Sequence, residues 1–351
     1  MRFPGRGVTF HDQGKATPGY TLFAPINVDH AFLIDLDGKV VNQWRLKKAG
    51  IGFCELLDNG NLFIIEDSGD GPDLKPGKGG MLREYDWRGN LVWEHHDPAQ
   101  HHDARRLPNG NTVYIGWELL DEVTAKRVQG GLPGTEHEAT GGIYGDVIRE
   151  VDAAGHVVWE WRASSLEIEK YPICPLCKRH EFAHANTCAP LPNGDLMISF
   201  RVLNLLIVIE RATGEVIWEH QDIELGHQHD CHVLENGNVL VFANGFHARD
   251  VNFSRVLEFD FETREQIWEF RGTPTHSFFS PHISGAQRLG SGNTLICEGA
   301  KGCIFETNPE GEIVWEFISP HESFNPLHGM VNWVYRAKRY GLGSPQIQNR
   351  V

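Results

Sequence analysis

The sequence predicts an all-β fold, a six-bladed β-propeller, and two repeated features support this prediction. A short aliphatic strand that ends in tryptophan occurs six times, at Trp44, Trp93, Trp159, Trp218, Trp268 and Trp315. Between successive tryptophans lies an Asn-Gly or Ser-Gly turn, at residues 59–60, 109–110, 193–194, 236–237 and 291–292. Four-stranded units that recur at about 40–50 residues are typical of propeller blades, because one blade cannot bury both of its faces alone.

The composition favours one soluble domain over residues 1–351. The chain is 40% hydrophobic and 23% charged, and the repeat uses nearly all of it. Its formal charge of −15 argues against nucleic acid as a partner, and its longest apolar run, 205–209, is too short to span a bilayer. The first residues lack the apolar segment of a signal peptide, and the seven cysteines have no framework spacing. We therefore expect a cytoplasmic protein without a membrane partner.

Each repeat predicts the same strand order. Each repeat begins with an inner strand, the Asn-Gly turn and a second strand. A loop, a third strand and a Gly turn come next, and an outer strand that ends in tryptophan completes the repeat. The alternation of apolar and polar residues supports several of these strands. Six pairs of third and outer strands are present, but only five pairs of inner and second strands. We expect the missing strands at 328–336 and 20–24, so that one blade contains both chain ends and no sheet edge stays exposed.

Two long connections interrupt the repeat, at about 118–142 and 162–183. The strand order places both on the same face of the ring, and long loops on a rigid scaffold often carry function. We interpret them as a lid over the central pocket.

The second connection contains a CxxC motif, Cys174 and Cys177, followed by His180. Such a motif can form part of a zinc knuckle, which Cys188 or His184 would complete. Inert loop thiols are the alternative interpretation.

Histidines gather at the lid-side ends of the inner strands. Counting back seven residues from each turn gives His102, Asn186, His229 and Ser284, and counting back nine gives Gln100, His184, His227 and His282. In a regular strand both sets point the same way. We expect His328 to open the closing inner strand. Packing alone gives little reason to gather imidazoles, because they repel when charged and lose hydration when buried, so the pattern predicts a site.

The chain resembles the arylsulfotransferase family, six-bladed propellers that transfer sulfuryl groups without a nucleotide donor. The matching segments cover 100–103, 182–186 with 197–201, 228–230 with 241–245, and 280–282 with 284–289. The resemblance extends over nearly the whole chain. Better-known members are periplasmic and have a signal peptide, a disulfide and an additional N-terminal domain, none of which is evident here.

The resemblance implies specific catalytic roles. His229 resembles the nucleophile that becomes a transient sulfohistidine, and His184 with Asn186 resembles the family's His-x-Asn pair. Arg201 resembles the sulfate-binding arginine, and His102 resembles the remaining histidine. A neutral imidazole can attack sulfur, while the planar guanidinium of Arg201 would hold the sulfate oxygens. This interpretation implies a small aromatic or anionic substrate, sulfuryl transfer between phenolic compounds, and no cofactor.

The surplus of histidines leaves other functions open. A metal-dependent enzyme could hold Fe, Zn, Cu or Mn with an open position for water or substrate, through His102, His184, His229, His282 and His328. A non-catalytic binding propeller is the second alternative, although it would not need convergent histidines.

Two further expectations concern packing. The six repeated tryptophans should lie between blades. Arg336, Lys338 and Arg339 should lie on a solvated face.

Overall fold

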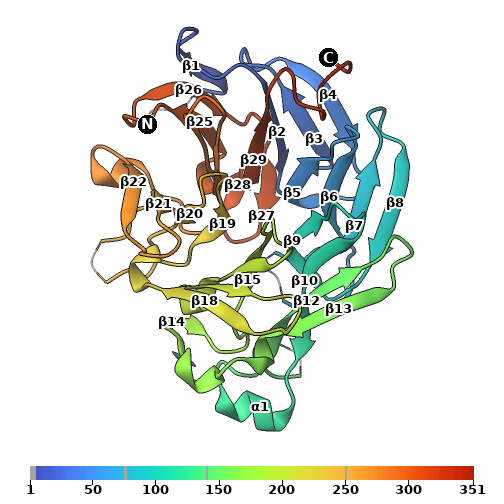
Figure 1. Ribbon diagram of the computed structural model, residues 1–351, viewed down its shortest axis with the longest axis vertical. Coiled ribbons are helices and arrows are strands. Elements are labelled where there is room, and N and C mark those ends of the chain that lie inside the picture. Colours follow the sequence, from blue (N-terminus) through green and yellow to red (C-terminus); the bar gives the residue numbers. More distant parts are fainter. Residues whose placement is uncertain (1–4, 75–76, 140, 250) are drawn as a thin grey trace.

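Six antiparallel sheets surround one axis in the computed structural model, which describes residues 5–74, 77–139, 141–249 and 251–351 (Figure 1). The first two blades consist of β5 (Gly50–Leu56), β6 (Leu62–Asp67), β7 (Gly80–Tyr85) and β8 (Leu91–His96), and of β9 (Gln100–Arg106), β10 (Thr112–Leu119), β12 (Tyr144–Val151) and β13 (Val157–Arg162). The third and fourth consist of β15 (Ala185–Pro190), β16 (Leu196–Phe200), β17 (Leu205–Ile209) and β18 (Val216–Gln221), and of β19 (His229–Val233), β20 (Val239–Ala243), β21 (Arg255–Phe259) and β22 (Gln266–Arg271). The predicted six-bladed propeller is confirmed.

The last two blades involve the N-terminal region. The fifth contains β23 (Gly285–Arg288), β24 (Thr294–Glu298), β25 (Cys303–Thr307) and β26 (Ile313–Ile318), and β1 (Gly7–His11) pairs with β26 as a fifth, outermost strand. The sixth has the order β29 (Val334–Tyr340), β2 (Tyr20–Pro25), β3 (His30–Ile34) and β4 (Val40–Arg45). The sequence did not predict β1.

The closing blade combines strands from the N-terminal region with the C-terminal strand, as the strand count predicts. Its inner strand β29 pairs with β2, which confirms the second strand expected at 20–24. The prediction that this inner strand begins at His328 is wrong. His328 lies in the turn of a short hairpin between β27 (Ser323–Asn325) and β28 (Gly329–Val331), and β29 begins only at Val334.

The six repeated tryptophans join each blade to the next. Every indole Nε1 donates a hydrogen bond to a backbone carbonyl of the following blade, at distances of 2.7–3.1 Å. The donors and acceptors are Trp44 to Asp86, Trp93 to Ala153, Trp159 to Arg211, Trp218 to Phe261, Trp268 to Pro309 and Trp315 to Leu36. The last bond crosses the seam at which the ring closes. Packing between blades is therefore confirmed for all six.

The two long connections fold against each other. The first contains α1 (Glu122–Arg127), which Asp121 caps, and β11 (Gly130–Leu132). The second contains the 3₁₀ turns η1 (Ala163–Ser165) and η2 (Ile168–Lys170), followed by β14 (Ile173–Lys178). β11 and β14 pair in parallel.

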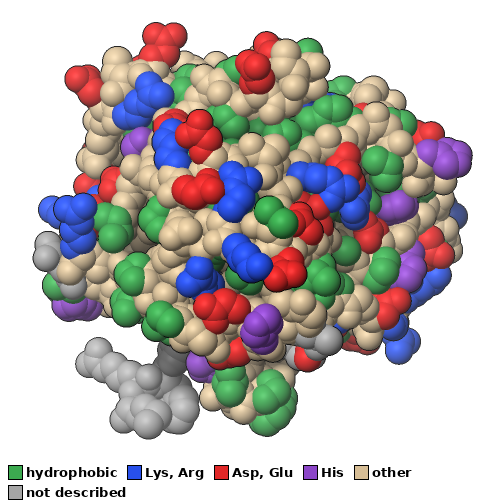
Figure 2. Space-filling view, turned by 90° about the horizontal axis from the view of Figure 1, so that it is seen from below, with side chains coloured by type: hydrophobic (Ala, Val, Ile, Leu, Met, Phe, Trp, Pro, Cys, Tyr) green, Lys and Arg blue, Asp and Glu red, His purple; other side chains and the backbone are tan. Residues whose placement is uncertain are grey.

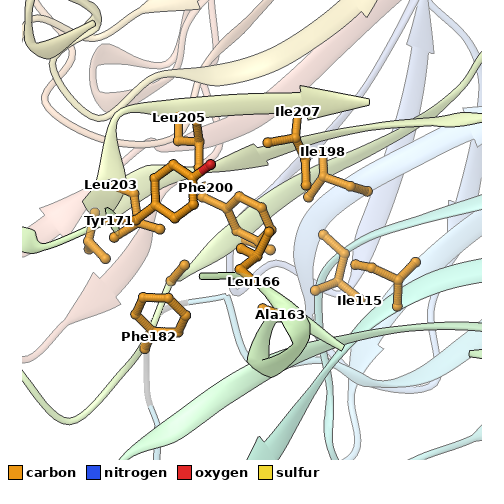
Figure 3. Close-up of a cluster of buried hydrophobic side chains, with 14 of the residues drawn as sticks. Ile115, Ala163, Leu166, Tyr171, Phe182, Ile198, Phe200, Leu203, Leu205 and Ile207 are labelled. Atoms are coloured by element: carbon orange, nitrogen blue, oxygen red, sulfur yellow. The ribbon is translucent and has the colours of Figure 1, made fainter. Parts of the chain in front are cut away.

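Buried apolar residues attach these connections to the second and third blades. Figure 3 shows Leu166, Tyr171 and Phe182 facing Phe200 and Ile115 in one cluster. The second connection is therefore part of the hydrophobic core. Its burial stabilises the folded state, because each Å² of apolar surface removed from water contributes about 25 cal/mol.

The face of the molecule seen from below is mixed in charge, with hydrophobic side chains scattered among the polar ones (Figure 2). Acidic and basic side chains are interspersed on the face seen in Figure 2. Among the described residues, no helix is long and apolar enough to cross a membrane.

Candidate active site

Three histidines from three neighbouring blades meet at one end of the axis. His102 lies in β9, His184 directly precedes β15, and His229 is the first residue of β19. Only 3%, 6% and 2% of their respective surfaces are exposed. The ring centroids of His102 and His184 lie 4.7 Å apart, and His229 interacts electrostatically with both rings. The structure thus brings together the three histidines that the family resemblance singled out.

Irregular backbone positions these side chains. His102, His184 and Asp230 have φ angles of 55°, 62° and 54°, in the left-handed region that residues other than glycine rarely occupy. At or next to these positions, each inner strand shifts register against its neighbour. The inner strands are therefore not regular, and the alternation assumed from the sequence does not hold there. Strain of this kind clusters at functional sites.

The other inner-strand histidines have different surroundings. His227 contacts Cys177, with 3.6 Å between Nε2 and Sγ. The His282 ring lies edge-on to Trp333 with 4.6 Å between centroids, and the exposed His328 ring lies 5.2 Å from the same indole. His282 and His328 thus form an outer group around Trp333.

His229 is held in one tautomer. Its Nδ1 lies 2.7 Å from Oδ1 of Asn244. The Asn244 amide nitrogen donates to the backbone carbonyls of Ser280 and Ile283, at 2.8 and 3.0 Å, so its oxygen must face the histidine. An amide oxygen only accepts, so Nδ1 of His229 carries the proton and Nε2 carries the lone pair. Burial, followed by the charge of Arg201, lowers the pKa of His229 well below its usual range.

His184 is paired with a buried carboxylate. Its Nδ1 lies 2.6 Å from Glu181 Oε2, and the other Glu181 oxygen accepts from the indole of Trp117 at 2.7 Å. Burial raises the pKa of Glu181, but the charge of His184 and these hydrogen bonds outweigh it and bring the pKa to about 2. Glu181 is therefore ionised, and it accepts a hydrogen bond from Nδ1 of His184.

His102 is supported by a second histidine. The Nδ1 atoms of His101 and His102 lie 2.7 Å apart, so one of them donates to the other. Nε2 of His101 lies 3.3 Å from Asp146 Oδ1, and the His101 ring stacks on Trp117 with 4.2 Å between centroids. Burial, followed by the charges of the neighbouring histidines and Arg201, lowers the pKa of His102 well below its usual range.

Arg201 is a cation without a carboxylate partner. It follows β16, and its backbone N–H donates to the His184 carbonyl at 3.0 Å. Its charge acts on His102, His229 and His282, and its guanidinium hydrogen-bonds the Cys177 side chain. Within the described ranges, no carboxylate oxygen lies within 4.0 Å of it, so the ordinary ion pair is not formed. A partly buried, unpaired guanidinium beside neutral imidazoles is suited to binding an anion.

Asn186 lies beside the three histidines but has a positioning contact. Its amide nitrogen donates to the Gln228 carbonyl at 2.7 Å, which fixes the residue that precedes His229. Its own carbonyl accepts from Arg336 at 3.0 Å. Asn186 therefore links the third blade to the fourth and to the closing blade.

Arg336 crosses the axis, contrary to the solvated position expected for it. Only 3% of its surface is exposed, and it pairs with Asp103 and Asp230 at 3.2 and 3.0 Å. Burial lowers the pKa of Arg336, but Asp230 and Asp103 outweigh burial and raise it. Arg339, equally buried, pairs with Glu306, so the expectation is also wrong there.

One group of possible metal ligands is present among the described residues, and it is not the axial one. The ligand atoms of Cys174, Cys177, His227 and His247 all lie within 4.8 Å of one another. No three of the five histidines considered for an axial metal approach one another so closely within those ranges. Of the partners expected for the CxxC motif, His184 binds Glu181, and Cys188 lies inside β15.

A pocket of about 970 Å³ opens at the opposite end of the ring, on the side of the Asn-Gly turns. Charged side chains from several blades line it, among them Glu55, Arg105 and Lys338, and His232 lies beside them. Arg336 and its two aspartates separate this pocket from the histidines.

Sequence reasoning missed the residues that orient the histidines. Glu181 comes from the second long connection, and Asp146 comes from β12, in the same blade as His101 and His102. Asn244 follows β20, the strand paired with the one that carries His229, and belongs to the matched segment 241–245. A search for amide or acidic residues at the ends of the second strands would have found Asn244.

Comparison with known proteins identifies the family and the fold. The family described as Arylsulfotransferase (ASST) matches residues 54–320. No curated protein matches the sequence.

Several solved structures share the fold at low identity. A protein of unknown function from Bacteroides caccae is 14% identical, with a TM-score of 0.56 over 92% of this chain and 99% of that one. A streptogramin B lyase is 10% identical, with a TM-score of 0.51 over 97% and 96%. The Cps50 (Swd1) propeller domain of Myceliophteria thermophila is 12% identical, with a TM-score of 0.51 over 98% and 95%. At these identities the likeness concerns the fold alone.

Proposed function

The chain belongs to the arylsulfotransferase family, and on this premise we propose that it transfers a sulfuryl group from an aryl sulfate to a phenol through His229. The observation that carries the proposal is the contact between His229 and Asn244, which leaves the lone pair on Nε2. A nucleophilic imidazole needs that lone pair, and the contact supplies it without a change of tautomer.

In the first half-reaction, Nε2 of His229 attacks the sulfur of the donor. The N–S bond forms as the S–O bond to the aryl group breaks, and the electron pair leaves with the phenolate oxygen. His184, protonated and paired with Glu181, gives that oxygen its proton. The product phenol departs, and His229 holds the sulfuryl group as a zwitterionic N-sulfoimidazolium, with a positive ring and a negative sulfonate, whose Nδ1–H still donates to Asn244.

In the second half-reaction, His184 accepts the proton of an incoming phenol as the phenol oxygen attacks sulfur. The new S–O bond forms, and the N–S electron pair returns to Nε2. The enzyme then regains its starting protonation. The donor carries the reactive sulfuryl group, so the proposed transfer uses no nucleotide and no other cofactor.

In the transition state, the transferring sulfuryl group carries its negative charge on three oxygens. Arg201 is the cation that would bind them, because no carboxylate in the described ranges competes for its donors. His102 would donate a hydrogen bond to the same oxygens. Asn186 contributes chiefly by holding the segment that carries His229.

The test compares variants in transfer from 4-nitrophenyl sulfate to phenol. His229→Ala should lose about 10⁴-fold in kcat, by analogy with removal of a catalytic-triad residue. His232→Ala is the matched control, because His232 lies on the same strand but lines the pocket at the opposite end. Equal activity in His229→Ala and the wild-type protein would overturn the proposal, since no step could then pass through His229.

A further inference from the structure

A second site is formed by two segments that are far apart in the sequence. Cys174 and Cys177 lie on β14, in the second long connection. His227 lies just ahead of β19, and His247 lies in the loop between β20 and β21. Both histidines belong to the fourth blade, so the four side chains meet where the second connection touches that blade.

Three sulfur–nitrogen distances among the four side chains match those expected around a tetrahedral metal ion. Cys174 Sγ lies 3.5 Å from His247 Nδ1, and Cys177 Sγ lies 3.6 Å from His227 Nε2 and 3.8 Å from His247 Nδ1. Zn–S bonds of about 2.3 Å and Zn–N bonds of about 2.0 Å imply S···N edges of about 3.5 Å in a tetrahedron. Because Cys177 faces both histidines, and all four atoms lie within 4.8 Å of one another, isolated S–H···N contacts do not explain the arrangement.

The backbone around the motif is shaped to bring both sulfurs to one side. In a regular strand, residues three apart point to opposite faces. Here Gly130 pairs with Ile173 and Leu132 with Lys178, so β14 accommodates three extra residues within this short ladder. The backbone N–H of Leu176 also donates to the Cys174 sulfur.

The chemistry of the four side chains suits a divalent cation. Cysteine sulfur and histidine nitrogen are the ligands of structural zinc sites. Cys174, Cys177 and His227 are buried, and two thiolates with two neutral imidazoles would balance the charge of a divalent ion, as a mostly buried site requires.

We propose that Cys174, Cys177, His227 and His247 bind one Zn²⁺ ion. Four protein ligands leave no open position, so the ion is structural rather than catalytic. Its role is to fix the second connection to the fourth blade, two residues from His229 and in contact with Arg201 through Cys177. This proposal does not depend on sulfuryl transfer, because metal content is its readout.

The test is elemental analysis of the full-length protein, produced in zinc-supplemented medium and dialysed against metal-free buffer. We expect one zinc per chain in the wild type and in Cys303→Ser, a matched control whose buried thiol lies in the fifth blade. Cys174→Ser and Cys177→Ser should retain less than about a tenth of it, because each loses a thiolate ligand.

Cobalt gives a second measurement on the wild-type chain alone, in case a ligand variant fails to fold. The Co²⁺-substituted protein should show the d–d absorption of a tetrahedral ion and a thiolate-to-cobalt charge-transfer band. Zinc-free protein that gives neither signal after reduction and addition of Co²⁺ would overturn the proposal. A Cys174–Cys177 disulfide in freshly purified, metal-free protein would overturn it as well, in favour of a redox pair.

Discussion

The Asn244 amide accepts the Nδ1 proton of His229 at 2.7 Å, while its nitrogen is bound to two backbone carbonyls. The amide therefore cannot turn over without leaving those carbonyls unpaired, and the histidine cannot change tautomer without facing an N–H. In the proposed transfer, this one contact fixes the orientation in which His229 acts as the nucleophile.

Replacing Asn244 should consequently test the orientation and tautomer of His229 while its imidazole remains present. Asn244→Leu removes the acceptor at nearly constant volume, so a part of the protein should hold the proton on Nε2 and be inactive. We expect kcat to fall by about 10²-fold or more, since a wrong tautomer costs about 10⁴-fold in serine proteases. Steady-state kinetics checks this, with zinc content as a control for intact folding. An unchanged kcat would show that Asn244 does not set the tautomer.

Gly77 provides a test of the position of His102. Its φ angle is +71°, and a Cβ atom there would lie 2.2–2.4 Å from the imidazole of His102. Gly77→Ala should push the ring aside and lower kcat, because a displacement of about 1 Å can cost about 10²-fold.

Gly134→Ala is the matched control for that substitution. Gly134 has a similar φ of +84°, but a Cβ atom there would meet nothing within 4 Å. In both variants, the left-handed backbone conformation should lower the free energy of unfolding by about 1–2 kcal/mol. Equal activities in the two variants would mean that contact with His102 is unimportant.

The tryptophan contact at the closing seam should contribute more to the free energy of unfolding than a tryptophan contact that is exposed to water. Trp315 is fully buried and donates to the Leu36 carbonyl at 2.7 Å, whereas the contact of Trp268 with Pro309 is exposed to water. Trp315→Phe should lower the free energy of unfolding by about 1–3 kcal/mol, because the carbonyl is left without a partner. Trp268→Phe should cost less, and urea unfolding of both variants tests the difference.

The free energy of unfolding should decrease in acid, and His102 should contribute to this dependence on pH. Burial keeps the folded-state pKa of His102 far below the value of about 6.5 expected when unfolded. Below that pH the unfolded chain binds a proton that the folded chain does not, so stability is complete above about pH 6.5 and declines as pH falls.

His102→Gln removes this one proton from the balance. Between pH 6 and pH 5, its free energy of unfolding should fall by up to about 1.4 kcal/mol less than that of the wild type. Urea titrations at several pH values measure both slopes. Parallel curves for the two proteins would contradict a neutral, buried His102.

The sequence predicted the fold well because the propeller repeat is a local signal. Each tryptophan and each Asn-Gly turn reports on its own blade, and the missing strand pair pointed to the closing blade. The start of its inner strand was misplaced by six residues, since the β27–β28 hairpin has no counterpart in the other blades.

The site was predicted only in part. His102, His184 and His229 were found from their distance to the turns and from the family motifs. The register of the neighbouring residues was not predicted, because bulges at His102, Ala185 and Asp230 break the alternation of side chains along the inner strands. His247 was missed altogether, as nothing near it in the sequence marks it as a partner of Cys174.

The most direct test of the central claim is mass spectrometry of the enzyme after it is mixed with an aryl sulfate in the absence of acceptor. The quench must be alkaline, because an N–S bond to imidazole is labile in acid. Sulfuryl transfer through His229 predicts one added SO₃ group on the peptide that contains His229, lost on addition of phenol and absent from His229→Ala. Turnover without such an adduct, or an adduct on another residue that phenol discharges, would contradict it.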